Sequence, residues 1–310
     1  MQTKKNIKLL VSLISIIVLI IIFFVFSTSK NNTSVDKGIF QILNLEKIDH
    51  IVLHSSTQEV DLKFDGTKWL VNGQEADRQM IKVLFAALKQ IEAKRPVATS
   101  IQDSVSKEIS KSGVKISCFE GNVLSKEFWS KGNQKETYFQ LVDGVPYLVT
   151  IPGYRVYLAS VFEMPSNDWR NKVVFNFNWQ NIKDLEVVFP GDPKQSFKAS
   201  FQNKLFSIEN ISVTDTTKLD VFMNALFQLR AERILTESQG KSYDSLLSQK
   251  PIETITIQDI GNRTYELKIF PLQKRNAIVI GKRNEEVIEL SPQVLREVFR
   301  KKDYFKGQSQ

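Results

Sequence analysis

The sequence predicts an α+β fold in which an N-terminal transmembrane helix precedes two tandem repeated units, each an antiparallel sheet with a long helix packed on it. Three observations predict it: one long apolar run near the N-terminus, a helix-like segment that recurs at a constant offset, and short alternating runs around both copies. The expected layout is a cytoplasmic N-terminus and signal anchor at 1–30, a linker at 31–45, units at 46–172 and 173–306, and a tail at 307–310.

The apolar run covers residues 7–26 and carries Lys8 as its only charge. A helix of about 20 residues spans roughly 30 Å, the hydrocarbon thickness of a bilayer. Lysines precede or open the run at positions 4, 5 and 8, whereas only Lys30 follows it closely. This bias predicts a single-pass protein of the bacterial cytoplasmic membrane, with its N-terminus inside and its bulk extracytoplasmic. The lipid bilayer is then a partner through residues 7–26.

A cleaved signal peptide is the alternative interpretation of this segment. Its apolar region normally runs about 7–15 residues and ends at a small-residue site. Here the run is longer and ends in Phe23, Phe24, Val25 and Phe26, which favours an uncleaved anchor. Ser27, Thr28 and Ser29 follow directly, so cleavage stays open.

Charge and composition exclude several classes of protein. The net charge is +8, but the first thirty residues hold four lysines and no acid, so the remaining chain carries only +4. The basic pI therefore reflects membrane topology, and no nucleic-acid partner is predicted. One cysteine excludes a disulfide framework and a cysteine zinc site, and two histidines leave little for any other metal site.

An internal repeat divides the rest of the chain. Residues 77–95 and 215–233 align without gaps at an offset of 138, and seven of the nineteen positions are identical. Apolar residues recur at three- and four-residue spacing in both segments, which predicts two amphipathic helices. Asp77 and Asp215 stand where a side chain caps the first helical turn.

Alternating runs before and after each helix predict the strands. In the first copy they lie at 50–54, 60–64, 68–71, 114–119, 124–129, 137–142 and 146–151. In the second copy they lie at 185–189, 196–201, 204–208, 253–260, 264–270, 277–280 and 286–290. A short helix closes each copy, at 154–162 and at 292–302. The segment 98–113 between the long helix and the later strands is expected to be a polar connector.

Several short motifs of this chain resemble motifs of a known family. They are Trp69 at a strand end, Asp77 before the ALKQIEAKR helix, Tyr138, the VPYLV run at 145–149 and DWRNK at 168–172. Together they resemble the bacterial domain of unknown function family 4340, over most of the chain after about residue 45, with a weaker version in the second copy. Members look like single-pass envelope proteins that are often encoded beside ABC-transporter permease and auxiliary components of the gliding-motility type. The family has no established catalytic residues, so the resemblance implies none here.

No motif in the chain predicts a catalytic, cofactor or metal site. His50 and His54 flank a strand-like run, where their rings would stand roughly 13 Å apart, too far to share a metal. The S-x-x-K at Ser104 and the K-S-G at Lys111 lie four residues apart, unlike the separated elements of penicillin-recognising enzymes. Gly240-Lys241-Ser242 lacks the first glycine of a phosphate-binding loop. Cys118, in an alternating run, is expected to be a buried small hydrophobe.

The aromatics at the junction of the copies are the one candidate docking site. Phe175, Phe177 and Trp179 alternate, and Trp169 lies just before them. Such a pattern indicates a sheet core, with a partner-docking surface as the alternative.

The leading functional hypothesis is a non-catalytic accessory or scaffolding protein of an envelope complex. Its expected partner is a transporter permease or auxiliary subunit, and no small-molecule ligand or cofactor is predicted. Two alternatives stay open: a module that binds a glycan or peptide between the repeats, and an envelope hydrolase that uses unidentified carboxylates.

Overall fold

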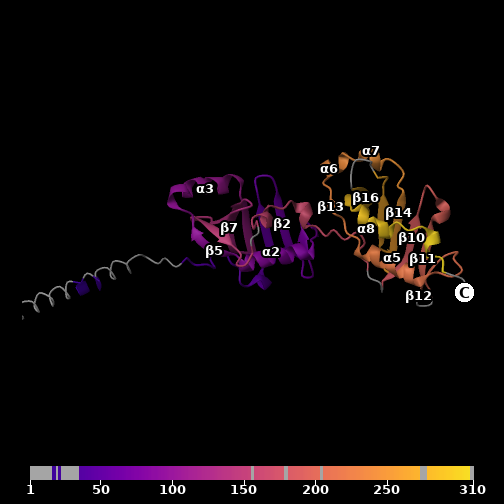
Figure 1. Ribbon diagram of the computed structural model, residues 1–310, viewed down its shortest axis with the longest axis horizontal. Helices are drawn as coiled ribbons and strands as arrows, with labels where there is room; N and C mark the ends of the chain where they lie inside the picture. Colours follow the sequence, from indigo (N-terminus) through magenta and orange to yellow (C-terminus); the bar gives the residue numbers. More distant parts are fainter. Residues whose placement is uncertain are drawn as a thin grey trace, which may run out of the picture.

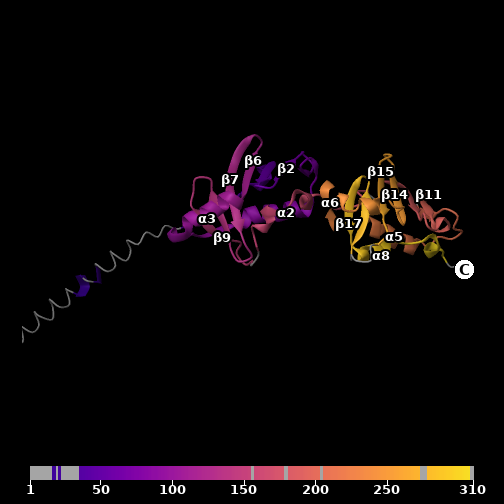
Figure 2. The same cartoon turned by 90° about the horizontal axis from the view of Figure 1, so that it is seen from above.

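The computed structural model describes residues 16–18, 20–21, 35–154, 157–177, 181–202, 205–272 and 278–307. Two sheet-based lobes lie end to end along the long axis of the molecule (Figures 1 and 2). The first lobe holds a nine-stranded sheet and the second an eight-stranded sheet, and every strand pairing in both is antiparallel.

The first sheet has the strand order β4-β3-β2-β1-β6-β7-β8-β9-β5. Its strands are β1 His50–His54, β2 Glu59–Phe64, β3 Trp69–Val71, β4 Gln74–Glu75, β5 Glu92–Pro96, β6 Val114–Glu120, β7 Val123–Gly132, β8 Thr137–Leu141 and β9 Pro146–Thr150. Asn72 and Gly73, both with positive φ, form the two-residue turn between β3 and β4, which is the turn that an Asn-Gly pair favours.

The second sheet repeats this arrangement with the order β12-β11-β10-β14-β15-β16-β17-β13. Its strands are β10 Ile182–Val188, β11 Phe197–Gln202, β12 Leu205–Ile208, β13 Arg233–Ile234, β14 Glu253–Asp259, β15 Thr264–Ile269, β16 Val279–Arg283 and β17 Glu286–Leu290. Among the described strands, β4 alone lacks a counterpart, and the other strands of the two sheets occupy matching places in the same chain order.

The helices are short. They are α2 Arg78–Gln90, α3 Thr99–Ser112, α4 Ser160–Glu163, α5 Thr216–Gln228, α6 Glu237–Lys241, α7 Asp244–Leu247 and α8 Pro292–Val298, with 3₁₀ turns η1 Leu45–Lys47, η2 Ser166–Trp169, η3 Pro193–Gln195 and η4 Lys302–Phe305. As the sequence predicts, Asp77 caps α2 and Asp215 caps α5. Helix α2 buries one stripe, Ile81, Leu84, Ala87 and Leu88, in the core of the first lobe.

The predicted fold class is wrong. The regular structure of the described residues is mostly sheet, and their longest helices have 13 and 14 residues. Helix α2 does not continue to Arg95, because Ile91 turns extended and the chain enters β5. The segment 98–113, expected to be a connector, forms α3, which buries only Ile109 and therefore carries little apolar signal.

The predicted transmembrane segment at 7–26 lies outside the described residues, apart from 16–18, 20 and 21. Within the part of the chain that the structure describes, no helix is both long enough and apolar enough to span a bilayer.

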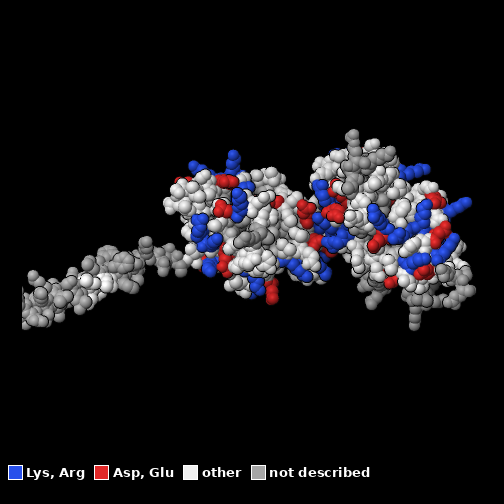
Figure 3. All heavy atoms as spheres, viewed as in Figure 1, with Lys and Arg blue, Asp and Glu red and all other residues white. Residues whose placement is uncertain are grey.

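Polar and charged groups join the two lobes. Figure 3 shows acidic and basic side chains gathered where the lobes meet. Arg230, which follows α5, pairs with Asp77 at the start of α2. Arg170 pairs with Glu286, to which the Nη2 of Arg283 also donates at 2.5 Å. Burial alone would raise the pKa of Glu286, but hydrogen bonds from the two arginines hold it below its usual value.

Backbone groups complete this junction. Asn171 donates from its backbone N–H to the carbonyl of Glu75 at 2.8 Å and from its side-chain amide to the Glu75 carboxylate at 2.9 Å. Arg283 donates to the carbonyls of Asn171 and Val173, at 3.1 and 2.7 Å. Asn171 of the connector is therefore bonded both to Glu75 of the first lobe and to Arg283 of the second.

The two helix caps, Asp77 and Asp215, each pair with a cation, Arg230 and Lys218 respectively, which allows a matched test. We expect Arg230→Gln to lower the free energy of unfolding by about 1–2 kcal/mol, because it leaves the nearly buried carboxylate of Asp77 without its cation. Lys218→Gln removes the cation from Asp215, a carboxylate that is more exposed than that of Asp77, and should change stability by less than about 0.5 kcal/mol. Urea denaturation of both variants measures the difference; equal midpoints would contradict the role assigned to Arg230.

One carboxyl group is buried without a partner. Glu253 begins β14 and is fully buried, and neither of its carboxyl oxygens has a hydrogen-bond partner. It lies opposite Ile269 in β15 and shares a sheet face with Ile255 and Ile257. Burial raises its pKa well above the usual value, so the folded protein holds the proton that the unfolded chain releases.

Because the folded state keeps this proton and the unfolded state loses it, the free energy of unfolding falls as pH rises above the ordinary glutamate pKa of 4.5. The slope from one retained proton is at most about 1.4 kcal/mol per pH unit. We expect Glu253→Gln to remove that slope, so that the variant gains stability relative to the natural protein between pH 5 and pH 8.

Urea denaturation across this pH range measures the effect. Glu289→Gln is the control, since Glu289 is also buried but lies 3.5 Å from Arg233. Parallel pH curves for Glu253→Gln and the natural protein would show that the carboxyl group is not held protonated.

Candidate functional site

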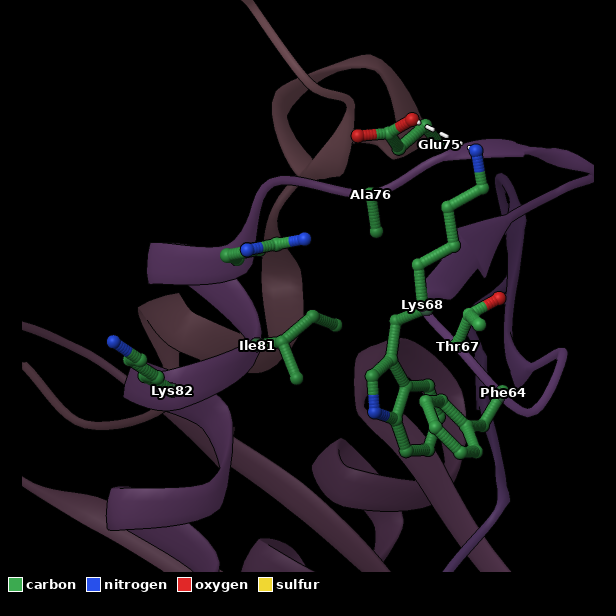
Figure 4. A pocket seen from close by; sticks show the side chains of 9 residues that line it. Phe64, Thr67, Lys68, Glu75, Ala76, Ile81 and Lys82 are labelled. Carbon is green, nitrogen blue, oxygen red and sulfur yellow. Dashed lines mark hydrogen bonds and ion pairs between the residues drawn. The ribbon is translucent and has the colours of Figure 1, made fainter.

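A hollow of about 230 Å³ lies on the first lobe between the β3–β4 hairpin and α2. Strand β2, the turn after it, and β3 supply one wall, and the first turns of α2 supply the other. Figure 4 shows Ile81 pointing into the hollow from the helix, opposite Phe64 and Lys68. We call it the Trp69 pocket, lined by Phe64, Thr67, Lys68, Trp69, Glu75, Ala76, Arg78, Ile81 and Lys82.

Aromatic rings form the floor of the Trp69 pocket. The rings of Phe64 and Trp69 lie with centroids 5.8 Å apart, and Trp69 meets Phe85 edge to face at 5.4 Å. Phe64 keeps 39% of its surface exposed. The floor therefore presents apolar area that the protein itself leaves uncovered.

Three cations surround this floor: Lys68, Arg78 and Lys82. The ammonium of Lys68 lies 2.9 Å from the carboxylate of Glu75, which raises the pKa of Lys68. Burial alone would raise the pKa of Glu75, but hydrogen bonds from Lys68 and Asn171 hold it below its usual value. Both groups are thus fixed in their charged forms.

Glu75 also connects the pocket to the junction. One carboxylate oxygen accepts from Lys68 in the pocket and the other from Asn171 between the lobes. Ala76, a pocket residue, forms an isolated β-bridge with Arg170. The Trp69 pocket and the junction therefore share one stretch of backbone.

Three of the four aromatics predicted as a possible docking site are buried. Trp169, Phe175 and Phe177 are at most 6% exposed. Trp169 belongs to the core of the first lobe, and Phe175 and Phe177 belong to that of the second. Core packing accounts for these three side chains. Trp179 lies outside the described residues.

The two histidines and the cysteine that the sequence analysis considered lie within strands of the first sheet. His50 and His54 lie on β1, each beside its own acidic neighbour, Asp61 or Glu59. β1 lies between β2 and β6 in the first sheet. Cys118 is buried, as predicted, and burial raises the pKa of its thiol to about 12. Among the residues described, no group of three His, Cys, Asp or Glu side chains could hold a metal ion.

Sequence reasoning noted Trp69 only as a strand end and missed the pocket. The feature of the sequence that points to the pocket is the pair of basic residues Arg78 and Lys82 near the start of α2, whose first turn contains no acidic residue. Anionic side chains are the ones that a helix N-terminus favours.

Comparison with known proteins locates the chain in a family. The family described as "Domain of unknown function (DUF4340)" matches residues 69–248, from Trp69 across the junction to the end of α7. Comparison with curated proteins and with solved structures gave no significant match. Since the match covers more than half of the chain and contains most of the Trp69 pocket, the chain belongs to the DUF4340 family.

Proposed function

We propose that this chain is a non-catalytic accessory protein that docks on an envelope complex, and that the Trp69 pocket is part of its docking surface. The observation that carries the proposal is the pocket itself: an exposed aromatic floor surrounded by cations, built next to the junction of the two lobes. Exposed apolar surface with a charged rim is typical of protein interaction sites.

The chemistry of the pocket suits binding better than catalysis. Lys68 is held protonated by Glu75, so its amine is a poor nucleophile and a poor base. Glu75 has a lowered pKa, so it is a weak general base. The hydroxyl of Thr67 already donates to Asp65 at 2.7 Å. The remaining groups offer charge and apolar contact.

The ion-paired junction supports the same proposal in another way. Because Arg230, Arg283 and Asn171 tie the lobes and their connector together, a partner that contacts both lobes meets one body and loses little entropy in ordering it. The envelope setting and a transporter-type partner rest on the family resemblance and on the N-terminal sequence.

Crosslinking in cells tests the proposal, with the full chain tagged and a lysine-reactive reagent. We expect one or a few envelope proteins to be enriched over a tag-only control, with crosslinks to Lys68 or Lys82. Arg78→Gln with Lys82→Gln should reduce the crosslinks formed through Lys68 several-fold, since it removes two cations from the pocket rim and leaves Lys68 in place.

The matched control is Lys107→Gln with Lys111→Gln, an exposed pair at the same spacing on α3. Equal crosslinking through Lys68 with both double variants, or no enriched protein at all, would sink the proposal.

A further inference from the structure

We propose that the Trp69 pocket receives an apolar side chain flanked by acidic residues, presented by a short segment of a partner protein. This inference rests on the proposed function and deepens it by naming the chemistry of the segment. Its basis is the combination of an exposed aromatic ring in the floor with two cations, Arg78 and Lys82, that form no ion pair among the described residues.

The floor specifies the apolar part of the segment. Phe64, Trp69 and Ile81 enclose a hollow of about 230 Å³, which suits a single large side chain from a partner. Ile81 is buried on the helix side, and Phe64 is partly open on the strand side. An inserted leucine or phenylalanine would cover the open face of the rings.

The charge on α2 specifies the acidic part. Arg78 is the first residue of the helix and Lys82 lies one turn later, both exposed. Cations at a helix N-terminus are unfavourable, and so are like charges four residues apart. Among the described ion pairs, neither Arg78 nor Lys82 takes part in one. Arg78 is near enough to Glu75 to help lower the pKa of that carboxyl, so its charge is partly compensated. An anion from outside the chain would stabilise this helix start further.

The second lobe provides an internal comparison. At the equivalent offset, α5 carries Thr216 and Asp220 instead of Arg78 and Lys82. Lys218 on α5 is paired with its own cap residue, Asp215. The same helix position thus exists without a pair of unmatched cations, so packing in this fold does not require them.

The polar inventory of the pocket favours a peptide over a sugar. A sugar ring brings several hydroxyl groups, and each loses free energy if it is desolvated without a partner. The hydroxyl of Thr67 is already used as a donor to Asp65, and Glu75 already accepts from Lys68 and Asn171. An apolar side chain needs no such partners, and carboxylates beside it meet Arg78 and Lys82 directly.

Phage display of random twelve-residue peptides on the purified full chain tests the inference. We expect enriched peptides to share a large apolar residue within two or three positions of Asp or Glu. Fluorescence polarisation of the best peptide should show roughly tenfold weaker binding to Arg78→Gln/Lys82→Gln. Binding to Lys107→Gln/Lys111→Gln should stay within about twofold, and added salt should weaken it.

A further variant and a competitor separate the remaining explanations. Phe64→Ala, at a half-exposed ring, should weaken peptide binding, while Val123→Ala at an exposed hairpin residue should not. Oligogalacturonate, an acidic sugar chain, should not displace the peptide.

Peptides without acidic residues, no enrichment, or equal binding to both double variants would overturn the inference. Displacement by oligogalacturonate at the same site would overturn it in favour of a glycan. If crosslinking still finds a partner that depends on Arg78 and Lys82, the proposed function stands and only the peptide chemistry fails.

Discussion

The carboxylate of Asp77 joins the local structure of the first lobe to the arrangement of the whole molecule. One oxygen accepts the backbone N–H of Gln79 at 2.8 Å and so caps α2. The other pairs with Arg230, which lies 153 positions later in the chain. The backbone N–H of Asp77 donates to the carbonyl of Trp169 at 2.7 Å. Helix start, lobe closure and lobe–lobe contact therefore depend on one residue.

Asp215 occupies the matching position in the second lobe, but its side chain makes no described contact with the first lobe. It caps α5, and its backbone N–H donates to the carbonyl of Phe305, the aromatic that closes its lobe. Its cation, however, is the local Lys218. The repeat thus conserves the cap and the closing contact, which each unit needs to fold, and differs in the surface around the helix, where the Trp69 pocket and the junction lie.

Local features could be predicted from the sequence, and distant ones could not. The caps Asp77 and Asp215 follow from short-range backbone requirements, and the structure confirms them. The fold class was misjudged because the extended residues after Gln90 were included in the helix, although Ile91 and Ala93 are buried at two-residue spacing. The pairing of Arg230 with Asp77 has no local pattern, so only the tertiary arrangement reveals it.

The carboxylate of Glu75 links the Trp69 pocket to the junction between the lobes. Its carboxylate is partly desolvated, a condition that favours the neutral form, yet donors from Lys68 and Asn171 keep it charged. Losing either donor would leave that charge poorly compensated, so the side chain is held between the pocket and the connector. The residues that line the pocket all belong to the first lobe, and Glu75 connects them through Asn171 to the segment between the lobes. The family match runs through this segment into the second lobe.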